Sequence, residues 1–185
     1  LEPNYACDNE RLYYTNKRLK FKNKFPGNLQ TCRFIANEET NPVNLFEFLL
    51  IDDHSAFFVD ACYSSSAMTF IKIPSQQVDS LEFVVNGDHR LSRWLKDSEN
   101  YYWHGAICRS SDVPIEVCDF SVAKIGEDVF LGSEIIEGFH ADHFHYLGDQ
   151  FFIDQHAIWN MTTTVEAGEL GGIGKIKNYL GRQPL

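Results

Sequence analysis

Short apolar runs, separated by clusters of Ser, Pro, Gly and Asp, dominate the middle of the chain. They cover residues 57–59, 68–73, 81–85, 101–107, 115–120 and 129–131. Runs of this length that are rich in Phe, Tyr, Val and Ile are typical of β-strands bounded by turns. The pattern therefore predicts an antiparallel sheet, arranged as a sandwich or as a barrel.

Two further segments show helical spacing. Asp88 is suited to cap a helix in which Leu91, Trp94 and Leu95 share one face. Apolar positions across residues 173–180 also recur at helical spacing, before a glycine. Each segment predicts a short amphipathic helix.

Residues 41–51 allow two interpretations. Asn41 and Pro42 form a favourable helix start, but the apolar run 45–51 would equally suit a buried strand. We leave this element open and find no internal repeat. The chain is predicted to be a single globular domain, residues 1–185, of the α+β class: predominantly antiparallel β, as a sandwich or barrel-like sheet, with two or three short helices.

Acidic residues outnumber basic ones. The sequence has 26 Asp and Glu against 16 Lys and Arg, which gives a formal net charge of −10. A field of that sign repels phosphate backbones and disfavours nucleic-acid binding. The charge either serves solubility or steers the chain toward a basic protein partner. Because no run of about 18 apolar residues occurs, no membrane span is expected.

The cysteines leave the compartment open. They are Cys7, Cys32, Cys62, Cys108 and Cys118. No CxxC pair is present, so a zinc site of four thiolates is not expected. An odd number is compatible with reduced thiols in the cytoplasm, or with two disulfides and a spare thiol in a secreted protein.

Four of the seven histidines lie between residues 138 and 156, in a segment with the pattern of a hairpin. A two-residue turn at 148–149 would pair His145 with Phe152, and His143 with Asp154. Side chains alternate along a strand and paired residues share a face. One face of the hairpin would therefore carry His143, His145, Asp154 and His156.

Three imidazoles and a carboxylate are ligands that divalent transition metals prefer. The four residues are accordingly our candidate metal site, with His140 as a spare or second-layer group. A polar strand face explains the same residues without a metal, with His143 and Asp154 as a cross-strand ion pair.

Two resemblances to known families follow from short segments. His143 and His145, followed by His156 and Asn160, are similar to the two metal motifs of cupins, although the spacing between the motifs differs from that family's. Tyr13-Tyr14, Thr31-Cys32 and the run 45–50 resemble the opening strands of arthropod lipocalins, over about a fifth of the chain. The second resemblance implies a β-barrel that binds a small ligand.

Three functional hypotheses result. The first is a non-catalytic, effector-type binding domain that holds a protein partner through its acidic surface and exposed aromatic residues. The second is a metal-dependent enzyme built on the hairpin, and the third is a small-ligand β-barrel. No GxSxG, HExxH or dinucleotide motif occurs in the sequence, so the first hypothesis is preferred.

Overall fold

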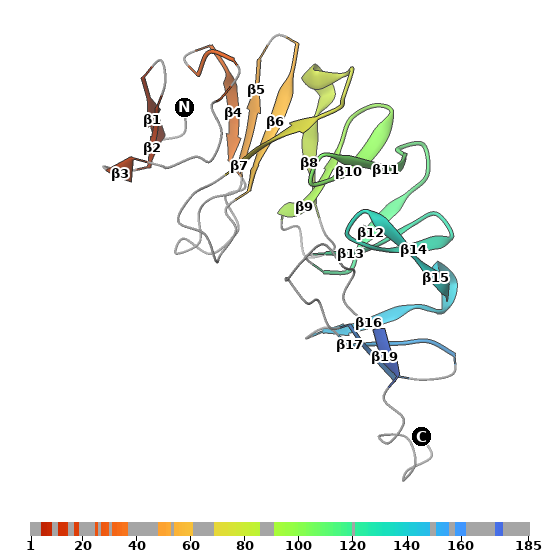
Figure 1. Ribbon diagram of the computed structural model, residues 1–185. Helices are drawn as coiled ribbons and strands as arrows, with labels where there is room; N and C mark the ends of the chain where they lie inside the picture. The colour runs from red at the N-terminus through yellow and green to blue at the C-terminus, as the bar shows by residue number, and fades with distance from the viewer. Residues whose placement is uncertain are drawn as a thin grey trace.

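The structure is a computed structural model in which the chain forms a succession of small antiparallel sheets (Figure 1). It describes residues 5–8, 11–14, 17–18, 25, 27–29, 31–36, 48–52, 54–60, 69–85, 91–119, 121–148, 151–155, 158–161 and 173–175.

The described strands make five sheets in chain order. The first sheet holds β1 (Tyr5–Cys7), β2 (Leu12–Tyr14) and β3 (Lys17–Arg18). The second holds β4 (Arg33–Ala36), β5 (Phe48–Ile51), β6 (Ala56–Asp60) and β7 (Thr69–Ile73). The third holds β8 (Glu82–Val85), β9 (Leu91–Lys96), β10 (Asn100–Trp103) and β11 (Ala106–Ser110).

The fourth sheet holds β12 (Ile115–Val117), β13 (Val122–Ile125), β14 (Asp128–Leu131) and β15 (Glu134–His140). The fifth holds β16 (His145–Gly148), β17 (Phe151–Ile153), β18 (Ile158–Met161) and β19 (Ile173–Lys175). Two single turns of 3₁₀ helix, η1 (Val78–Ser80) and η2 (Ala141–His143), connect the second sheet to the third and the fourth to the fifth.

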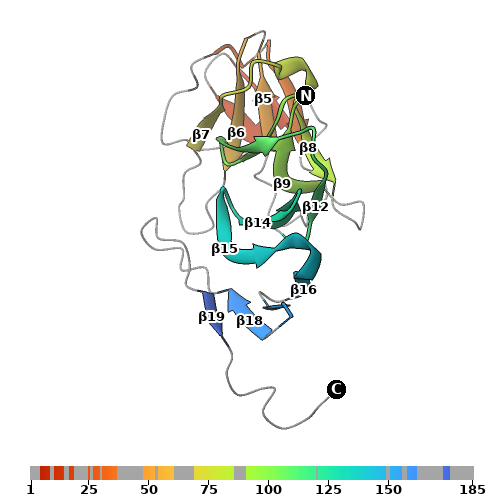
Figure 2. The same cartoon turned by 90° about the vertical axis from the view of Figure 1, so that its right-hand side faces the viewer.

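Every sheet is a meander in which each strand pairs with the next strand along the chain. Figures 1 and 2 show the sheets following one another along an open arc. Successive four-stranded meanders of this kind are the arrangement from which the blades of β-propellers are built.

Strands in the middle of the arc are buried on both faces. In β5, Phe48 and Leu50 pack toward the first sheet, whereas Leu49 and Ile51 pack toward the third. Strand β14 alternates in the same way, with Phe130 facing the third sheet. Four apolar layers therefore separate the five sheets, and a strand between two layers needs apolar residues at consecutive positions.

A row of aromatic rings crosses three of the sheets. Phe58 in β6 lies 5.4 Å, between ring centroids, from His104 in the turn between β10 and β11. The imidazole stacks on Trp103 at 4.8 Å, and Trp103 lies 5.1 Å from Trp94. Trp94 meets Phe130 of the fourth sheet edge to face at 6.2 Å.

The predicted α+β class is wrong, because strands predominate and the described residues contain no helix of seven residues or more. The helix expected after Asp88 is strand β9 in the structure. The adjacent residues Trp94 and Leu95 point into different apolar layers, because the strand is buried on both faces. Apolar residues at consecutive positions of such a strand produce the same spacing as one face of a helix. The described strands form separate sheets rather than one barrel or a two-sheet sandwich.

Other expectations are settled only in part. In the open segment 41–51, residues Phe48–Ile51 form strand β5, while the possible helix start at Asn41 lies outside the described residues. Ile173–Lys175 is a strand and not the start of a helix; residues 176–180 lie outside the described part.

Candidate functional site

Turns and linkers of successive sheets meet at one edge of the molecule. In each four-stranded sheet, the turn concerned joins the second strand to the third. In the first sheet, the corresponding turn joins β1 to β2. The linkers are the segments that lead from one sheet to the next. Ser111 N–H donates to the Glu99 carbonyl at 2.9 Å, and Ala141 N–H donates to the Glu127 carbonyl at 2.9 Å. Each bond joins a linker to such a turn, and we call this border the turn edge.

The same turn recurs along this edge. Asp8, Asp52 and Asp97 each follow the second strand of a sheet or its equivalent and lie 44 and 45 residues apart. Each carboxylate accepts a backbone N–H from its own turn: that of Arg11 for Asp8, at 2.7 Å, and that of Ser55 for Asp52, at 2.6 Å. Such Asp turns preorganise a tight reversal between strands.

Asp97 is the most elaborated of these turns. The residue is 5% exposed. It accepts the Ser75 hydroxyl and the Tyr102 hydroxyl, both at 2.5 Å, and the N–H groups of Glu99 and Asn100 at 2.8 and 2.7 Å. Burial alone would raise the pKa of Asp97, but these hydrogen bonds outweigh burial and lower it.

The hydrogen bonds decide what this carboxylate can do. Burial, together with the hydrogen bond to Asp97, raises the pKa of Tyr102 to about 12, so the phenol keeps its proton at neutral pH. An ionised carboxylate with four donors has little basicity left for a reacting group. The network therefore fastens the linker to the third sheet and is unsuited to acid–base catalysis.

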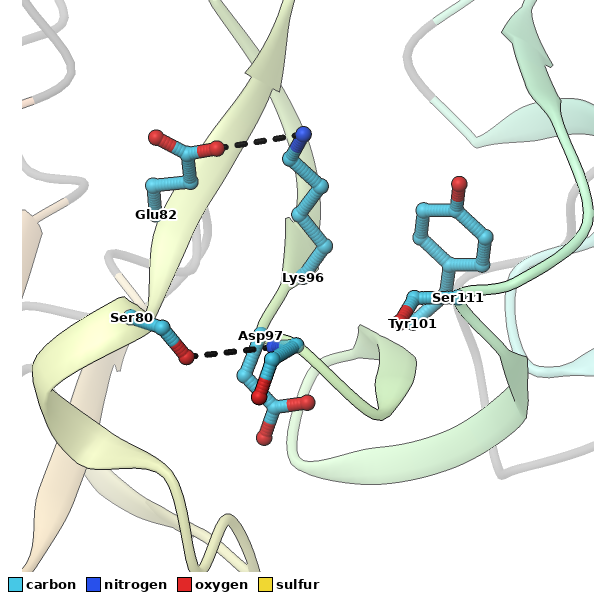
Figure 3. A pocket seen from close by; sticks show the side chains of 7 residues that line it. Ser80, Glu82, Lys96, Asp97, Tyr101 and Ser111 are labelled. Carbon is cyan, nitrogen blue, oxygen red and sulfur yellow. Dashed lines mark hydrogen bonds and ion pairs between the residues drawn. The ribbon is translucent and has the colours of Figure 1, made fainter.

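An open polar cleft of about 310 Å³ lies beside the Asp97 turn (Figure 3). It is lined by Ser80, Glu82, Lys96, Asp97, Ser98, Tyr101 and Ser111. Lys96 Nζ lies 3.1 Å from Glu82 Oε1, and the Ser80 hydroxyl accepts the N–H of Ser98 at 3.1 Å. A cleft of this composition suits polar or charged groups of a binding partner rather than an apolar ligand.

Exposed carboxylates recur along the turn edge. They are Asp8, Asp79, Glu99, Asp112, Glu127 and Asp142. Two basic side chains also lie there: Arg11 belongs to one of the described turns, and the guanidinium of Arg33, from β4, donates to the carbonyls of Val78 and Asp79 in the linker before the third sheet. Exposed carboxylates therefore outnumber the basic groups along the turn edge, from the first sheet to the linker before the fifth.

The hairpin that carries the candidate metal site is present, but its register differs from the prediction. His145 pairs with Ile153, and a bulge near Gly148 offsets the strands by one residue. His143 is exposed in η2 and precedes the strand, and Asp154 lies just after β17. His156 lies outside the described residues, so the four-residue metal site stays a prediction.

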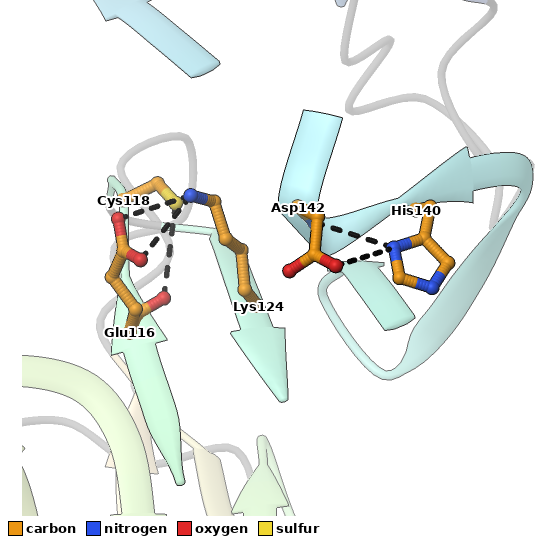
Figure 4. A network of polar contacts seen from close by, with 5 residues as sticks. All are labelled: Glu116, Cys118, Lys124, His140 and Asp142. Atoms are coloured by element: carbon orange, nitrogen blue, oxygen red, sulfur yellow. Dashed lines mark hydrogen bonds and ion pairs between the residues drawn. The ribbon is translucent and has the colours of Figure 1, made fainter. Parts of the chain in front are cut away.

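A different pair of histidines comes together. The rings of His140 and His143 lie 6.0 Å apart. His140 Nδ1 also lies 3.7 Å from Asp142 Oδ2, as Figure 4 shows. Nearby, Lys124 Nζ contacts both oxygens of Glu116 at 3.2 Å. No group of three or more His, Cys, Asp or Glu side chains that could hold a metal ion occurs within the described part of the chain.

The four described cysteines, Cys7, Cys32, Cys108 and Cys118, are reduced thiols. Burial raises the pKa of Cys108 to about 12 and that of Cys118 to about 11. A thiol with a raised pKa is a poor nucleophile at neutral pH, so these two are structural residues. Cys62 lies outside the described residues.

Comparison of the chain with protein families, with curated proteins and with solved structures found no match. Among the described residues, no helix is long and apolar enough to cross a membrane.

Proposed function

We propose that the chain is a non-catalytic binding domain whose turn edge docks a basic protein partner. One observation supports this above others: exposed carboxylates recur at the turn edge from the first sheet to the linker before the fifth. Rows of like charge raise the association rate of an oppositely charged partner and help to fix its orientation.

Packing leaves this edge available. The broad faces of the second, third and fourth sheets are covered by their neighbours, so most of their apolar side chains are buried between sheets. Turns and linkers, by contrast, present polar side chains to solvent on a scaffold fastened by hydrogen bonds such as those of Asp97. A rigid edge loses little conformational entropy on binding.

The cleft of the third sheet lies at the middle of the arc. Glu82, which is exposed there, is paired with Lys96 and can exchange that partner for a basic side chain of an incoming protein. Serine hydroxyls at Ser80, Ser98 and Ser111 supply acceptors around it. The cleft is therefore where we expect the partner's central basic side chain to bind.

The test begins with affinity capture on the immobilised chain and identification of the partner. Association rates are then measured across a salt series for the wild type and for the double variant Glu99→Gln/Asp112→Asn. We expect the wild-type rate to fall as salt rises, and the double variant to associate severalfold more slowly.

A matched control removes two charges elsewhere. Glu134→Gln/Glu137→Gln lies on β15, outside the turn edge, and both side chains are exposed. This control should keep the wild-type association rate. A rate that ignores both salt and the turn-edge substitutions would overturn the proposal.

A further inference from the structure

Two cysteines from different sheets pack against the same apolar layer. Cys7 is the last residue of β1 in the first sheet, and Cys32 directly precedes β4 in the second. Both side chains are partly buried against the cluster of Leu29, Phe48 and neighbouring residues that joins these two sheets. The packing of the first sheet on the second therefore brings both thiols into one layer.

A single turn accepts the hydrogen bonds of both thiols. The Cys7 thiol donates to the Leu29 carbonyl at 3.4 Å, and the Cys32 thiol donates to the Asn28 carbonyl at 3.2 Å. Asn28 also accepts the N–H of Thr31 at 3.2 Å, which closes the turn. Because consecutive Cα atoms are about 3.8 Å apart, the two sulfurs lie against neighbouring acceptors of this turn.

The strand register places the two cysteines at corresponding ends of their sheets. Cys7 and Ile51 occupy equivalent positions, since each directly precedes the aspartate that begins the turn after its strand. Ile51 pairs with Arg33, the residue that follows Cys32. Cys32 therefore lies beside the strand end that is equivalent to the one carrying Cys7, in agreement with the turn that both thiols contact.

We propose that Cys7 and Cys32 are an oxidation site, and that the disulfide formed between them fastens the first sheet to the second. The oxidant is a low-molecular-weight disulfide such as oxidised glutathione. The Cys32 thiolate attacks one of its sulfurs and releases a glutathione thiolate. Cys7 then attacks Cys32 Sγ in the mixed disulfide and releases a second glutathione thiolate. The two protons that the cysteines lose are taken up by the two glutathione thiolates.

The surroundings of the pair permit this reaction. Burial raises the pKa of the Cys7 thiol, which assigns Cys7 to the second, intramolecular step. The disulfide replaces two hydrogen bonds from thiols, which are weak donors. Asn28 and Thr31 are exposed, so the turn can shift until the Cβ atoms reach the separation of about 3.8 Å that a disulfide requires.

The bond would stabilise one end of the stack. It closes a loop between residues 25 positions apart, which restricts the unfolded chain. The first sheet lies at one end of the described arc, where local opening is easiest (Figure 1). Oxidation should therefore protect β1 and β2 most.

The experiment equilibrates the reduced wild-type chain with a series of reduced and oxidised glutathione mixtures. Remaining thiols are then alkylated, and tryptic peptides are identified by mass. Trypsin places Cys7 in the peptide 1–11 and Cys32 in the peptide 25–33. These two peptides should appear joined by a disulfide, while Cys108 and Cys118, which pack in other layers, should still be alkylated.

Hydrogen exchange of the reduced and oxidised chains accompanies the mapping. Oxidation should slow exchange in β1 and β2 by about tenfold or more in the wild type and in the control Cys118→Ser, and should leave it unchanged in Cys32→Ser. The proposal is overturned if the joined peptides form at no glutathione ratio, or if either residue bonds mainly to another cysteine such as Cys62. Equal protection in Cys32→Ser would also overturn it. Because the mapping uses the unaltered chain, it decides the question even where a serine variant unfolds more easily.

Discussion

The carboxylate of Asp97 ties together three parts of the chain: the linker before the third sheet, the turn that the residue itself begins, and strand β10. Ser75 and Tyr102 reach it from the linker and from β10. A buried charge is tolerated only when its hydrogen-bonding capacity is filled, as it is here. The residue is therefore a fastening point for the turn edge.

Asp97→Asn should lower the free energy of unfolding by about 2–3 kcal/mol, because an amide cannot accept all four hydrogen bonds and carries no charge. Chemical denaturation measures the change. Asp112→Asn is the control: Asp112 is exposed at the same edge, and its substitution should cost less than about 0.5 kcal/mol. Equal losses in both variants would contradict the role given to Asp97.

The pH dependence of stability should follow the same residue. Its pKa in the folded chain lies below its usual value, about 3.9 in an unfolded chain, so ionisation of Asp97 stabilises the fold above that value. This contribution is lost as the pH falls through the folded pKa. The stability difference between wild type and Asp97→Asn should therefore shrink in acid; a difference that stays constant would refute this account.

The sequence contains a signal for part of the turn edge. Asp8, Asp52 and Asp97 recur at intervals of 44 and 45 residues, and each precedes an aromatic residue by five positions; this repeat in the sequence was not predicted. Ser75, which donates to Asp97, lies 22 residues before it in the chain. The two residues come into contact only because the second and third sheets pack against each other. The hydrogen-bonded network could not be derived from spacing alone.

Strands whose ends are marked by turn residues could be predicted from the sequence, and strands joined by an apolar turn could not. The runs at 57–59 and 129–131 fall inside β6 and β14, because turn residues mark both ends of each run. The run 101–107 was predicted as one strand, but it contains a reversal at His104 and Gly105, both with positive φ. Aromatic and apolar residues on both sides of this turn conceal it.

Gly105 offers a test of this turn. Its φ is 84°, and an added Cβ would lie 2.6 Å from Ile71 Cγ2 and 2.9 Å from the Lys72 carbonyl oxygen. Gly105→Ala should therefore destabilise the fold through both backbone strain and a clash with the second sheet, by about 3–4 kcal/mol in all.

Gly138→Ala is the matched control, because Gly138 has a φ of 85° but no atom within 4 Å of an added Cβ. It should show backbone strain alone, about 1–2 kcal/mol. Urea unfolding of both variants gives the comparison. Equal destabilisation would show that the approach to Ile71 is not a tight contact.

The whole molecule is a stack in which each apolar layer joins neighbouring sheets. Architectures of this kind have stabilities that sum over units and nearest-neighbour layers, so the ends of the stack open more easily than the middle. This arrangement could not be predicted from alternation of polar and apolar residues, because strands buried on both faces lack it.

Two phenylalanines test the stack. Phe58 lies between the second and third sheets and Phe152 between the fourth and fifth, and both are fully buried. Each substitution by Ala should cost about 3–5 kcal/mol in its own layer. In hydrogen exchange, Phe58→Ala should lower protection across the central sheets, whereas Phe152→Ala should affect mainly β16 and β17. Identical exchange patterns would indicate a single cooperative unit instead.

The row of rings from Phe58 through His104, Trp103 and Trp94 to Phe130 also has an optical consequence. Its two indoles lie 5.1 Å apart in the third sheet. Phe130 of the fourth sheet packs against Trp94, and Phe58 of the second sheet reaches Trp103 through the ring of His104. Their electronic transitions are therefore coupled through space. A change in the spacing of the second, third and fourth sheets should therefore alter the near-ultraviolet circular dichroism and the tryptophan emission. These two signals report on deformation of the arc without an added label.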